Sequence, residues 1–299
     1  MRRVGVLIAF PQSHPFAQAF VAAFARALGR LGWVEGKNIR IDYRFAAGDP
    51  ALFKSYAAEL VGLAPDAILA STAPALAALQ QQTSAIPIVF VIVPDPVGRG
   101  LVTSLARPGG NITGFASYDA SIVGKWVQLL KGAVPGVTRA SIIFNPDTAL
   151  APPLDPVVNA APSIGVTVTL APVHDDAGIK EAIAAQAREP GGGLIILPDS
   201  FNVTHSGVIV AAAVRSKLPS IGWTEFARAG GLMSYWYDAV ELHAEAGSYI
   251  DRILKGADPA DLPVQYPTKY SLIINLKTAK ALGLTIPERV LEIADEVIE

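Results

Sequence analysis

Small polar residues that directly follow apolar runs are the side chains of this sequence best suited to chemistry. The clearest are Ser71 and Thr72 after residues 67–70, Asp95 after residues 88–93, and Asp199 after residues 194–197. Hydroxyl and main-chain N–H groups bind anions where a helix begins, and a carboxylate binds an ammonium or hydroxyl group through a charge-assisted hydrogen bond. These residue types at the ends of apolar runs therefore indicate a binding site for a small polar molecule.

The segment from Ser71 to Pro74 carries the most informative of these signals. Two hydroxyl residues precede a proline that fits the first turn of a helix, so free N–H groups and the positive end of the helix dipole face the site. We expect the N–H groups of Ser71 and Thr72 to hold a carboxylate. An ordinary helix cap without a ligand explains the same residues, and the local sequence by itself favours that simpler interpretation.

Asp95 and Asp199 end corresponding strands of two similar series and have two alternative roles. Either carboxylate could hold a cationic or hydroxyl group of a ligand, or it could cap the turn that follows it. The two do not form a general acid and base pair, because they belong to different series and no nucleophile stands in a recognisable elbow or triad spacing. The sequence therefore predicts no enzymatic activity and no catalytic residue.

Further candidate ligand-binding residues stand at the remaining strand ends. They are Gln12, His14, Tyr118, Asn145, Trp223 and Tyr235. Aromatic residues gather at the same ends, namely Phe10, Phe115, Tyr118, Phe201, Trp223, Phe226, Tyr235 and Trp236. Because ligand pockets are largely apolar and aromatic, we expect about half of these rings to line a cleft and the others to lie in the core.

The histidines and glycine clusters predict no metal site and no cofactor. The four histidines, His14, His174, His205 and His243, lie far apart and lack the spacing of metal ligands. His14 follows the first strand and is a ligand candidate, whereas the other three are expected at the surface or as helix caps. Residues 191–193 precede a strand, so these glycines form a turn rather than a dinucleotide-binding fingerprint.

The composition excludes several classes of protein. The 299 residues contain no cysteine, which excludes thiolate metal sites, iron–sulfur clusters, thiol catalysis and disulfide scaffolds. A net charge of -2 provides no basic surface for nucleic acid or an anionic membrane. Hydrophobic residues make up 51% and charged residues only 17%, against about 25% in typical domains, so the chain must bury an unusually large apolar fraction.

The elements that must position these residues form two series of alternating strands and helices. In the first series, strands are expected at residues 4–10, 39–45, 67–70, 88–93 and 112–115, with helices at 16–31, 51–63 and 74–82. The second begins with a helix through Trp126 and Leu130, followed by strands at 140–144, 166–170, 194–197 and 220–222 and helices at 150–163, 178–188 and 204–217. In each series only the second strand alternates apolar and polar residues, as is typical of a strand near a sheet edge. The pattern predicts an α/β protein with two doubly wound lobes of strand order 2-1-3-4-5.

Two segments could be mistaken for membrane or export signals. The charge-free run between Asp66 and Asp95 is long enough to cross a bilayer, but turn residues divide it into strand, helix and strand. The first residues imitate a signal peptide, yet an apolar helical stripe that includes Phe16 and Phe20 continues through the expected cleavage site. We therefore favour a strand and a helix there. Near the other end, a strand at 232–235, a helix at 239–256 and a strand at 270–276 form a tail that we expect to join the lobes.

Several longer motifs resemble the substrate-binding proteins of a family of ABC importers. The matching segments are residues 86–98, 100–114, 230–235, 252–257, 260–263, 275–284 and 294–298, so the similarity covers essentially the whole chain. This family includes tryptophan- and phenylalanine-binding members. The resemblance implies a type I periplasmic-binding-protein fold, in which two Rossmann-like lobes joined by a hinge and three crossovers close around a ligand. We expect the first lobe to contain residues 1–116 and about 233–268, and the second to contain residues 117–232 and about 269–299.

The resemblance also implies partners and a location. A monomer in the periplasm or at the cell surface would pass an amino acid or another carboxylate to permease and ATPase subunits. The sequence starts at its first strand, as expected of a mature or trimmed form without its export signal. Trp236 stands where the resemblance suggests glycine, which would reshape the cleft and change the ligand. Two alternatives stay open: the ligand-sensing effector domain of a lac-repressor-type regulator, which specific DNA binding would reveal, and a two-lobed α/β enzyme, which substrate turnover would reveal.

Overall fold

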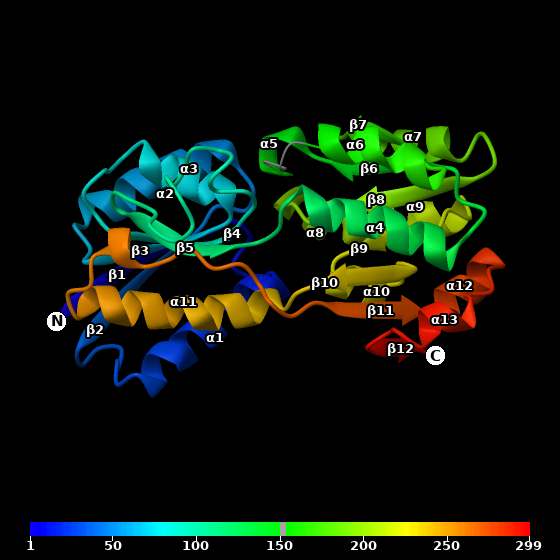
Figure 1. The fold of residues 1–299 in the computed structure, drawn as a ribbon. Helices are drawn as coiled ribbons and strands as arrows, with labels where there is room; N and C mark the ends of the chain where they lie inside the picture. Colours follow the sequence, from blue (N-terminus) through cyan, green and yellow to red (C-terminus); the bar gives the residue numbers. More distant parts are fainter. Residues whose placement is uncertain (150–153) are drawn as a thin grey trace. The chain divides into compact units, whose positions relative to one another are not determined.

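The computed structural model describes residues 1–149 and 154–299, which form two compact units (Figure 1). Unit 1 contains Met1–Tyr118 and Asp238–Pro267, and unit 2 contains Asp119–Tyr237 and Thr268–Glu299. The chain therefore passes from one unit to the other three times, after Tyr118, Tyr237 and Pro267.

Unit 1 is built on a five-stranded parallel sheet. Its strands are β1 (Arg2–Ile8), β2 (Ile39–Phe45), β3 (Ala67–Ser71), β4 (Ile88–Val93) and β5 (Ile112–Ala116), in the order β2-β1-β3-β4-β5. Its helices are α1 (Pro15–Arg30), α2 (Pro50–Gly62), α3 (Ala73–Gln80) and α11 (Ala239–Leu254), with a short 3₁₀ turn, η2 (Pro259–Asp261). Helices α1 and α11 pack together on one face of the sheet, and α2 and α3 pack together on the other (Figure 1). The predicted strand order is confirmed.

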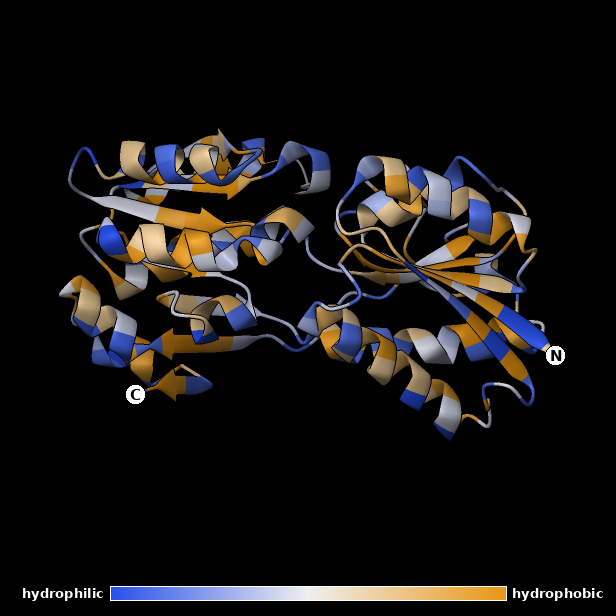
Figure 2. Ribbon diagram, turned by 180° about the vertical axis from the view of Figure 1, so that it is seen from behind, coloured by the Kyte–Doolittle hydropathy of each residue, from blue (hydrophilic) through white to orange (hydrophobic). Residues whose placement is uncertain are grey.

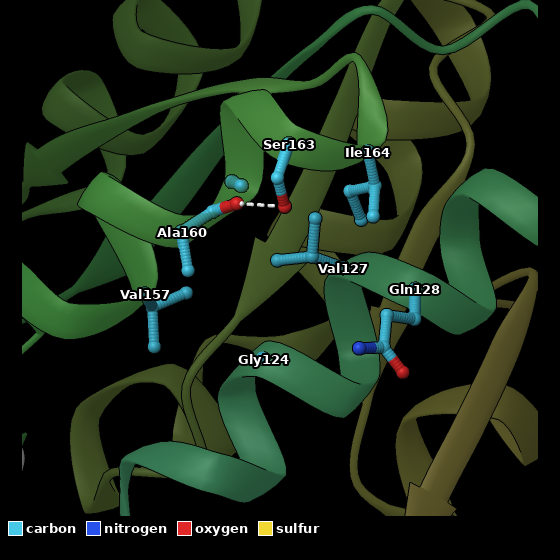
Figure 3. Close-up of a pocket in the computed structure, with 8 residues that line it drawn as sticks. Gly124, Val127, Gln128, Val157, Ala160, Ser163 and Ile164 are labelled. Carbon is cyan, nitrogen blue, oxygen red and sulfur yellow. Dashed lines mark hydrogen bonds between the residues drawn. The ribbon is translucent and has the colours of Figure 1, made fainter.

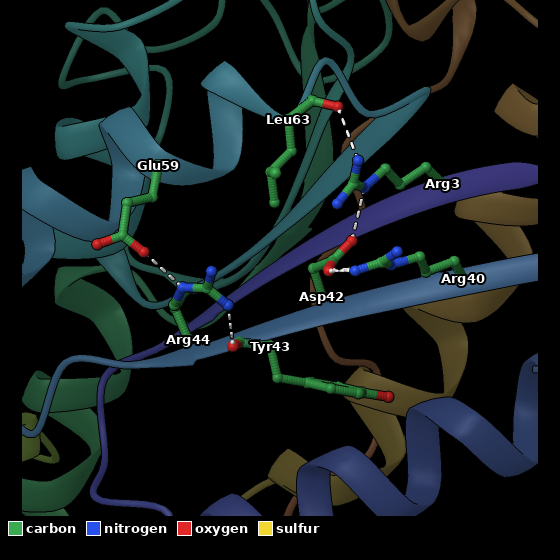
Figure 4. A network of polar contacts seen from close by, with 7 residues as sticks. All are labelled: Arg3, Arg40, Asp42, Tyr43, Arg44, Glu59 and Leu63. Atoms are coloured by element: carbon green, nitrogen blue, oxygen red, sulfur yellow. Dashed lines mark hydrogen bonds and ion pairs between the residues drawn. The ribbon is translucent and has the colours of Figure 1, made fainter.

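The polar residues of β2 stabilise the edge of this sheet (Figure 4). Asp42 accepts a hydrogen bond from Arg3 Nε of β1 at 2.7 Å and forms an ion pair with Arg40 at 3.3 Å. Arg44 donates to Glu59 of α2 at 2.8 Å. Charged side chains on an edge strand discourage pairing with a foreign strand. The alternation of polar and apolar residues in this segment therefore correctly indicated an edge strand.

Unit 2 is built on a seven-stranded mixed sheet. Its strands are β6 (Arg139–Phe144), β7 (Thr167–Pro172), β8 (Gly192–Ile196), β9 (Ser220–Gly222), β10 (Met233–Trp236), β11 (Ser271–Asn275) and β12 (Glu296–Ile298). The order is β12-β11-β10-β9-β8-β6-β7, and β11 runs antiparallel to β10. The strands β7-β6-β8-β9-β10 repeat the order found in unit 1, so the prediction of two doubly wound lobes is confirmed.

Helices cover both faces of the second sheet as well. They are α4 (Ala120–Ala133), α5 (Pro146–Ala149), α6 (Asp155–Ala160), α7 (Asp176–Gln186), α8 (Ser200–Thr204), α9 (Ser206–Arg215), α10 (Thr224–Arg228), α12 (Leu276–Leu282) and α13 (Glu288–Leu291), with the 3₁₀ turn η1 (Ala161–Ile164). Helix α4 contacts α6, and α7 contacts α9. Many of these helices begin at an acidic or amide cap: Asp175 accepts from Gly178 N at the start of α7, and Asn275 accepts from Thr278 N at the start of α12.

Three elements differ from the sequence prediction. The first residues of the helix expected at 150–163 lie outside the described residues. The rest of that range forms α6 and η1. Each of these begins with a proline in its first turn, where the missing N–H costs nothing. The helix expected at 204–217 corresponds to α9, and a separate short helix, α8, which Asp199 caps, precedes it and ends at Thr204. Residues 233–237, which the sequence pattern assigned to the first lobe, belong to unit 2, because β10 pairs in parallel with β9 and continues the second series.

The high apolar content has a structural cause. In Figure 2 the strands of both sheets are mainly orange, whereas the surrounding helices combine orange and blue. Strands β3 and β4 are almost entirely buried, and they and α3 account for the charge-free run of the sequence. Within residues 1–149 and 154–299, no helix combines the length and the apolarity that crossing a membrane requires.

Candidate functional site

The carboxyl ends of the unit 1 strands bring several predicted residues to one edge of the sheet. Thr72 N–H, directly after β3, donates to Val91 O within β4 at 2.8 Å. Asp95 N–H donates to Tyr118 O at 3.3 Å, which joins the loops after β4 and β5. Because ligands of open parallel sheets bind at this edge, Thr72, Asp95 and Tyr118 share one candidate site.

Thr72 adopts a backbone conformation that a threonine rarely takes. Its φ of 88° and ψ of 162° lie in a region that is essentially reserved for glycine and costs about 1–3 kcal/mol for other residues. Its hydroxyl does not cap α3, and Thr72 Oγ1 is buried without a hydrogen-bond partner among the described residues. A buried hydroxyl of this kind normally has a partner, so both features point to a group that the site is built to receive.

The donors at the start of α3 differ from those expected. Thr72 N–H is already bonded to Val91 O, so it does not hold a carboxylate in this conformation. The first intrahelical bond runs from Leu76 N to Thr72 O, and helix geometry leaves the N–H groups of Ala73 and Ala75 without an intrahelical acceptor. An anion at this helix start would therefore meet those two N–H groups and Thr72 Oγ1.

Ser71 is buried and is held by a histidine distant in the sequence. Ser71 Oγ lies 2.9 Å from His243 Nε2, and His243 Nδ1 lies 2.8 Å from Ala239 O in the first turn of α11. His243 is 1% exposed, and burial lowers its pKa to about 4, so the ring is neutral near pH 7. The prediction that His243 lies at the surface or caps a helix is wrong. One signal could have located it: His243 shares the apolar helical stripe of Ala246 and Ile250.

His14 begins helix α1 rather than standing alone in the loop. Its Nδ1 accepts a hydrogen bond from Phe16 N at 3.2 Å, and its ring stacks on Phe10 at 4.9 Å between centroids. Partial burial lowers the pKa of His14. Gln12, in the same loop, is exposed. Both residues follow β1 and so lie at the carboxyl edge of the unit 1 sheet.

Asp95 closes a tight turn after β4. Its Oδ1 accepts a hydrogen bond from Gly98 N at 3.0 Å, and its φ is 43°. Ile92 also has a positive φ, 60°, where β4 is irregular between Val91 and Val93. The turn-capping role of Asp95 is therefore present, and its second carboxylate oxygen is the one that could meet a ligand.

In unit 2 the carboxylate of Asp199 is saturated with donors from its own unit. It accepts hydrogen bonds from Asn145 N at 3.1 Å, Thr148 Oγ1 at 3.1 Å and Asn202 N at 2.8 Å. Asp199 is 5% exposed, and burial raises its pKa to about 6, although these donors oppose the shift. Asp199 thus caps α8 and fixes the loop after β6, which joins it directly to the predicted residue Asn145.

Next to this cap, the hydroxyl of Ser200 is buried and has no hydrogen-bond partner within the described part of the chain. Residue type alone gave no reason to choose Ser200 over its neighbours.

Aromatic residues form the rest of the unit 2 edge. Trp223 follows β9, is 3% exposed and packs against Phe226 at 5.3 Å. Tyr235 stacks on Tyr270 at 5.4 Å, and its carbonyl oxygen accepts a hydrogen bond from Trp126 Nε1 at 2.7 Å. Tyr235 is partly exposed and thus the more accessible of the two predicted aromatic residues.

Trp236, where the resemblance suggested glycine, is 4% exposed and packs within unit 2. Its indole lies 5.4 Å from that of Trp126 and 4.4 Å from the ring of Tyr237. Of the other aromatic candidates, Phe115 and Phe226 are fully buried and serve the cores of their units.

A separate pocket on unit 2 lies between helix α4 and the segment of α6 and η1 (Figure 3). Its volume is about 90 Å³, and it is lined mainly by small apolar side chains such as Val127, Val157 and Ala161. None of the predicted site residues lines it. Within residues 1–149 and 154–299, no three His, Asp or Glu side chains gather as a metal site.

Comparison with known proteins gives a consistent result. The chain is 28% identical over 273 residues to a tyrosine-binding protein of Clostridioides difficile. The aligned region covers 91% of this chain and 78% of that protein. A crystal structure of a conserved domain protein from Vibrio cholerae superposes with a TM-score of 0.91 at 32% identity over 99% of both chains. The structure of an ABC domain in complex with L-Trp from Streptococcus pneumoniae superposes with a TM-score of 0.89 at 27% identity, also over 99% of both chains.

The model of one family matches residues 4–298, nearly the whole chain, and it describes an ABC transporter substrate binding protein. The two doubly wound units and the polar edges of their sheets agree with that description. The chain belongs to the ABC transporter substrate-binding protein family.

Proposed function

We propose that this protein binds an aromatic amino acid or a closely related carboxylate and presents it to an ABC importer. The observation that carries the proposal is the start of α3, where a strained Thr72 leaves a buried hydroxyl without a partner beside two helix N–H groups. A carboxylate satisfies all three donors and benefits from the helix dipole. The relatives that bind tyrosine and L-Trp support an amino acid as the source of that carboxylate.

The other predicted residues receive roles that follow from their surroundings. Asp95, with one carboxylate oxygen engaged in its turn, holds the ammonium group through the other oxygen. The partly exposed Tyr235 contacts the body of the ligand, together with the exposed edge of the loop of Gln12 and His14, whereas Tyr118 is only 4% exposed and supports the edge from within. Ser71 and Asp199 support loops: the first is fully buried and the second is saturated by internal donors.

Transport follows from a change of conformation. A ligand that binds the closed form more tightly than the open form shifts the equilibrium toward closure, and the closed form is recognised by the permease. We assign the lobes to unit 1 and unit 2 and the hinge to the three crossovers. The protein acts as an exported monomer that binds without catalysis. The family match favours this function over a transcriptional regulator or an enzyme.

Calorimetry on protein that has been unfolded and refolded to remove any retained ligand tests the proposal. We expect L-tyrosine or L-tryptophan to bind, while tryptophanamide (no carboxylate) and indole-3-propionate (no ammonium) each bind at least tenfold more weakly, a difference of about 1.4 kcal/mol. If no amino acid binds, the proposed ligand class is wrong. If the amide binds as tightly as the acid, the role of the α3 start is wrong.

A matched pair of variants locates the site. Thr72→Val removes only the unpartnered hydroxyl, so we expect unchanged stability and about tenfold weaker binding, in line with the loss of one hydrogen bond to a charged group. Thr113→Val makes the same exchange in the middle of β5, where Thr113 Oγ1 donates to Leu262 O at 2.6 Å. This control should lower stability and leave affinity unchanged.

A further inference from the structure

His243 has a single hydrogen-bonding arrangement that suits both of its ring nitrogens. Nδ1 lies 2.8 Å from Ala239 O, and a carbonyl oxygen can only accept, so Nδ1 carries the proton. In the neutral ring Nε2 is then an acceptor, and it lies 2.9 Å from Ser71 Oγ. The hydroxyl of Ser71 therefore donates its proton to His243, which determines the orientation of that hydroxyl.

The surroundings of His243 leave little freedom to either partner. Its ring stacks on Phe20 of α1 at 3.8 Å between centroids with an interplanar angle of 9°. Ser71 is 0% exposed, so its hydroxyl has no contact with water that could replace the histidine. A buried donor that loses its acceptor costs about 1–3 kcal/mol.

The same rings connect two loops that are distant in the sequence. Phe20 stacks on Phe16 at 5.6 Å, and Phe16 lies 5.5 Å from the ring of His14, the residue that begins α1. The contacts therefore run from the loop after β1, through α1, to His243 and then to Ser71 at the end of β3.

Thr72 shows why such support is needed. Its φ of 88° is unfavourable for a threonine and persists only if the neighbouring contacts determine it. On one side Thr72 N–H donates to Val91 O. On the other side the preceding residue, Ser71, is held by His243. Without the second contact the chain could relax toward an ordinary conformation, and the start of α3 would turn away from its binding geometry.

We propose that His243 is a positioning residue: by accepting the hydroxyl proton of Ser71, it holds Thr72 and the start of α3 in the conformation that binds the ligand. This inference rests on the proposed function, because it concerns the same site. His243 touches no ligand itself. It acts from a helix that the chain contributes after its return to unit 1.

Three variants separate the acceptor from the ring. His243→Phe keeps a ring against Phe20 and removes the acceptor. His243→Gln removes the ring but places an amide oxygen within reach of Ser71, which makes it the conservative variant. Tyr249→Phe is the matched control on the same helix, since it deletes a partly buried hydrogen bond to Pro263 O, 2.6 Å long, that does not involve Ser71.

Two measurements read out the position of the loop. We expect His243→Phe to bind L-tyrosine or L-tryptophan about tenfold more weakly, and His243→Gln to recover most of that loss, as the removal and restoration of one acceptor require. Without ligand, hydrogen exchange in a peptide covering residues 70–80 should accelerate about tenfold in His243→Phe and return toward the wild-type rate in His243→Gln. Tyr249→Phe should lower the melting temperature and change neither quantity.

A double variant tests whether the effect passes through Ser71. If it does, Ser71→Ala combined with His243→Phe weakens binding no further than either change alone. Additive losses overturn the proposal, and so does a Gln variant as impaired as the Phe variant. If the wild type binds neither amino acid, the proposed function fails, but the exchange rates of the three variants still decide the role of His243.

Discussion

Acidification should act in opposite directions on the two units, because each contains one buried titratable group with a shifted pKa. Burial lowers the pKa of His243 in unit 1 from 6.5 to about 4. Between pH 6.5 and pH 4 the unfolded chain binds a proton at this histidine and the folded chain does not. The stability due to this group is therefore present above pH 6.5 and is lost as the pH falls toward 4. Burial raises the pKa of Asp199 in unit 2 from 3.8 to about 6. The folded chain retains a proton there, so this contribution is present below pH 3.8 and is lost as the pH rises through 6.

The magnitudes follow from these pKa values by linkage. Between pH 7 and pH 5, His243 lowers the free energy of unfolding by about 2 kcal/mol, and Asp199 raises it by about 1 kcal/mol. Both side chains are almost completely buried, so solvent screens neither effect strongly. The two contributions oppose one another, and the wild type as a whole should change little over this interval.

Hydrogen exchange at increasing urea concentration, followed in peptides from each unit, separates the two effects at pH 7 and pH 5. On acidification, unit 1 of the wild type should lose about 2 kcal/mol that His243→Gln does not lose, whatever that variant costs at pH 7. Unit 2 of the wild type should gain about 1 kcal/mol that Asp199→Asn does not gain, because asparagine resembles the protonated acid and does not titrate.

Comparing each variant with the wild type cancels the contributions that all undisturbed titrating groups make to the pH dependence of stability. A pH dependence in unit 1 that is identical in the wild type and His243→Gln would refute the reasoning, since it would mean that the histidine is solvated and protonates normally. An Asp199→Asn variant with the wild-type response in unit 2 would show that the hydrogen bonds to the carboxylate outweigh its burial.

Three further changes test the packing that supports the site. Gly114→Ala should prevent unit 1 from folding, because a Cβ would lie 2.1 Å from Phe90 O and the φ of 152° disfavours alanine; a normal circular dichroism spectrum and melting curve would contradict this. Trp126→Phe should lower the free energy of unfolding by about 2 kcal/mol in urea titrations, because it leaves the buried indole site underfilled and removes the hydrogen bond to Tyr235 O; a loss below about 0.5 kcal/mol would show that the core adjusts. Asp238→Ala removes the cap that accepts from the first N–H groups of α11 and should cost about 1 kcal/mol, with Asp238→Asn close to the wild type; equal losses in both variants would assign the effect to charge.

Much of the fold could be predicted because the sequence contains local signals for it. The alternation of apolar and polar residues in β2 reflects one exposed face, and the same is true of β7, so both edges and the strand order followed. The assignment of β10 to the first lobe failed for a related reason. A strand of four residues carries no signal for its partner, and only its pairing with β9 shows which sheet it joins.

Candidate site residues could be chosen from the sequence only at strand ends. Contact of Thr72, Asp95 and Asp199 with a ligand stays a prediction, and these residues were chosen by the rule that loops at the carboxyl ends of parallel strands bind ligands. It could not identify His243, because the contact with Ser71 joins residues 172 positions apart through a helix added after the second unit. Nor could it reveal the φ of Thr72, since residue type does not encode an unfavourable conformation that the surroundings impose.

We propose that the sheet edges of the two units make different contributions to recognition. Asp199 accepts hydrogen bonds from three groups of its own unit, and a carboxylate so engaged has little left for an ammonium group. In the same unit, Tyr235 is partly exposed and stacks on Tyr270. In unit 1, by contrast, the hydroxyl of Thr72 is buried without a hydrogen-bond partner among the described residues, and its φ of 88° is a strained conformation for a threonine. On this proposal, unit 1 recognises the charged groups of the amino acid, and unit 2 discriminates among side chains. Exchanging Tyr235 should accordingly change which amino acid binds, whereas exchanging Thr72 should weaken the binding of all of them.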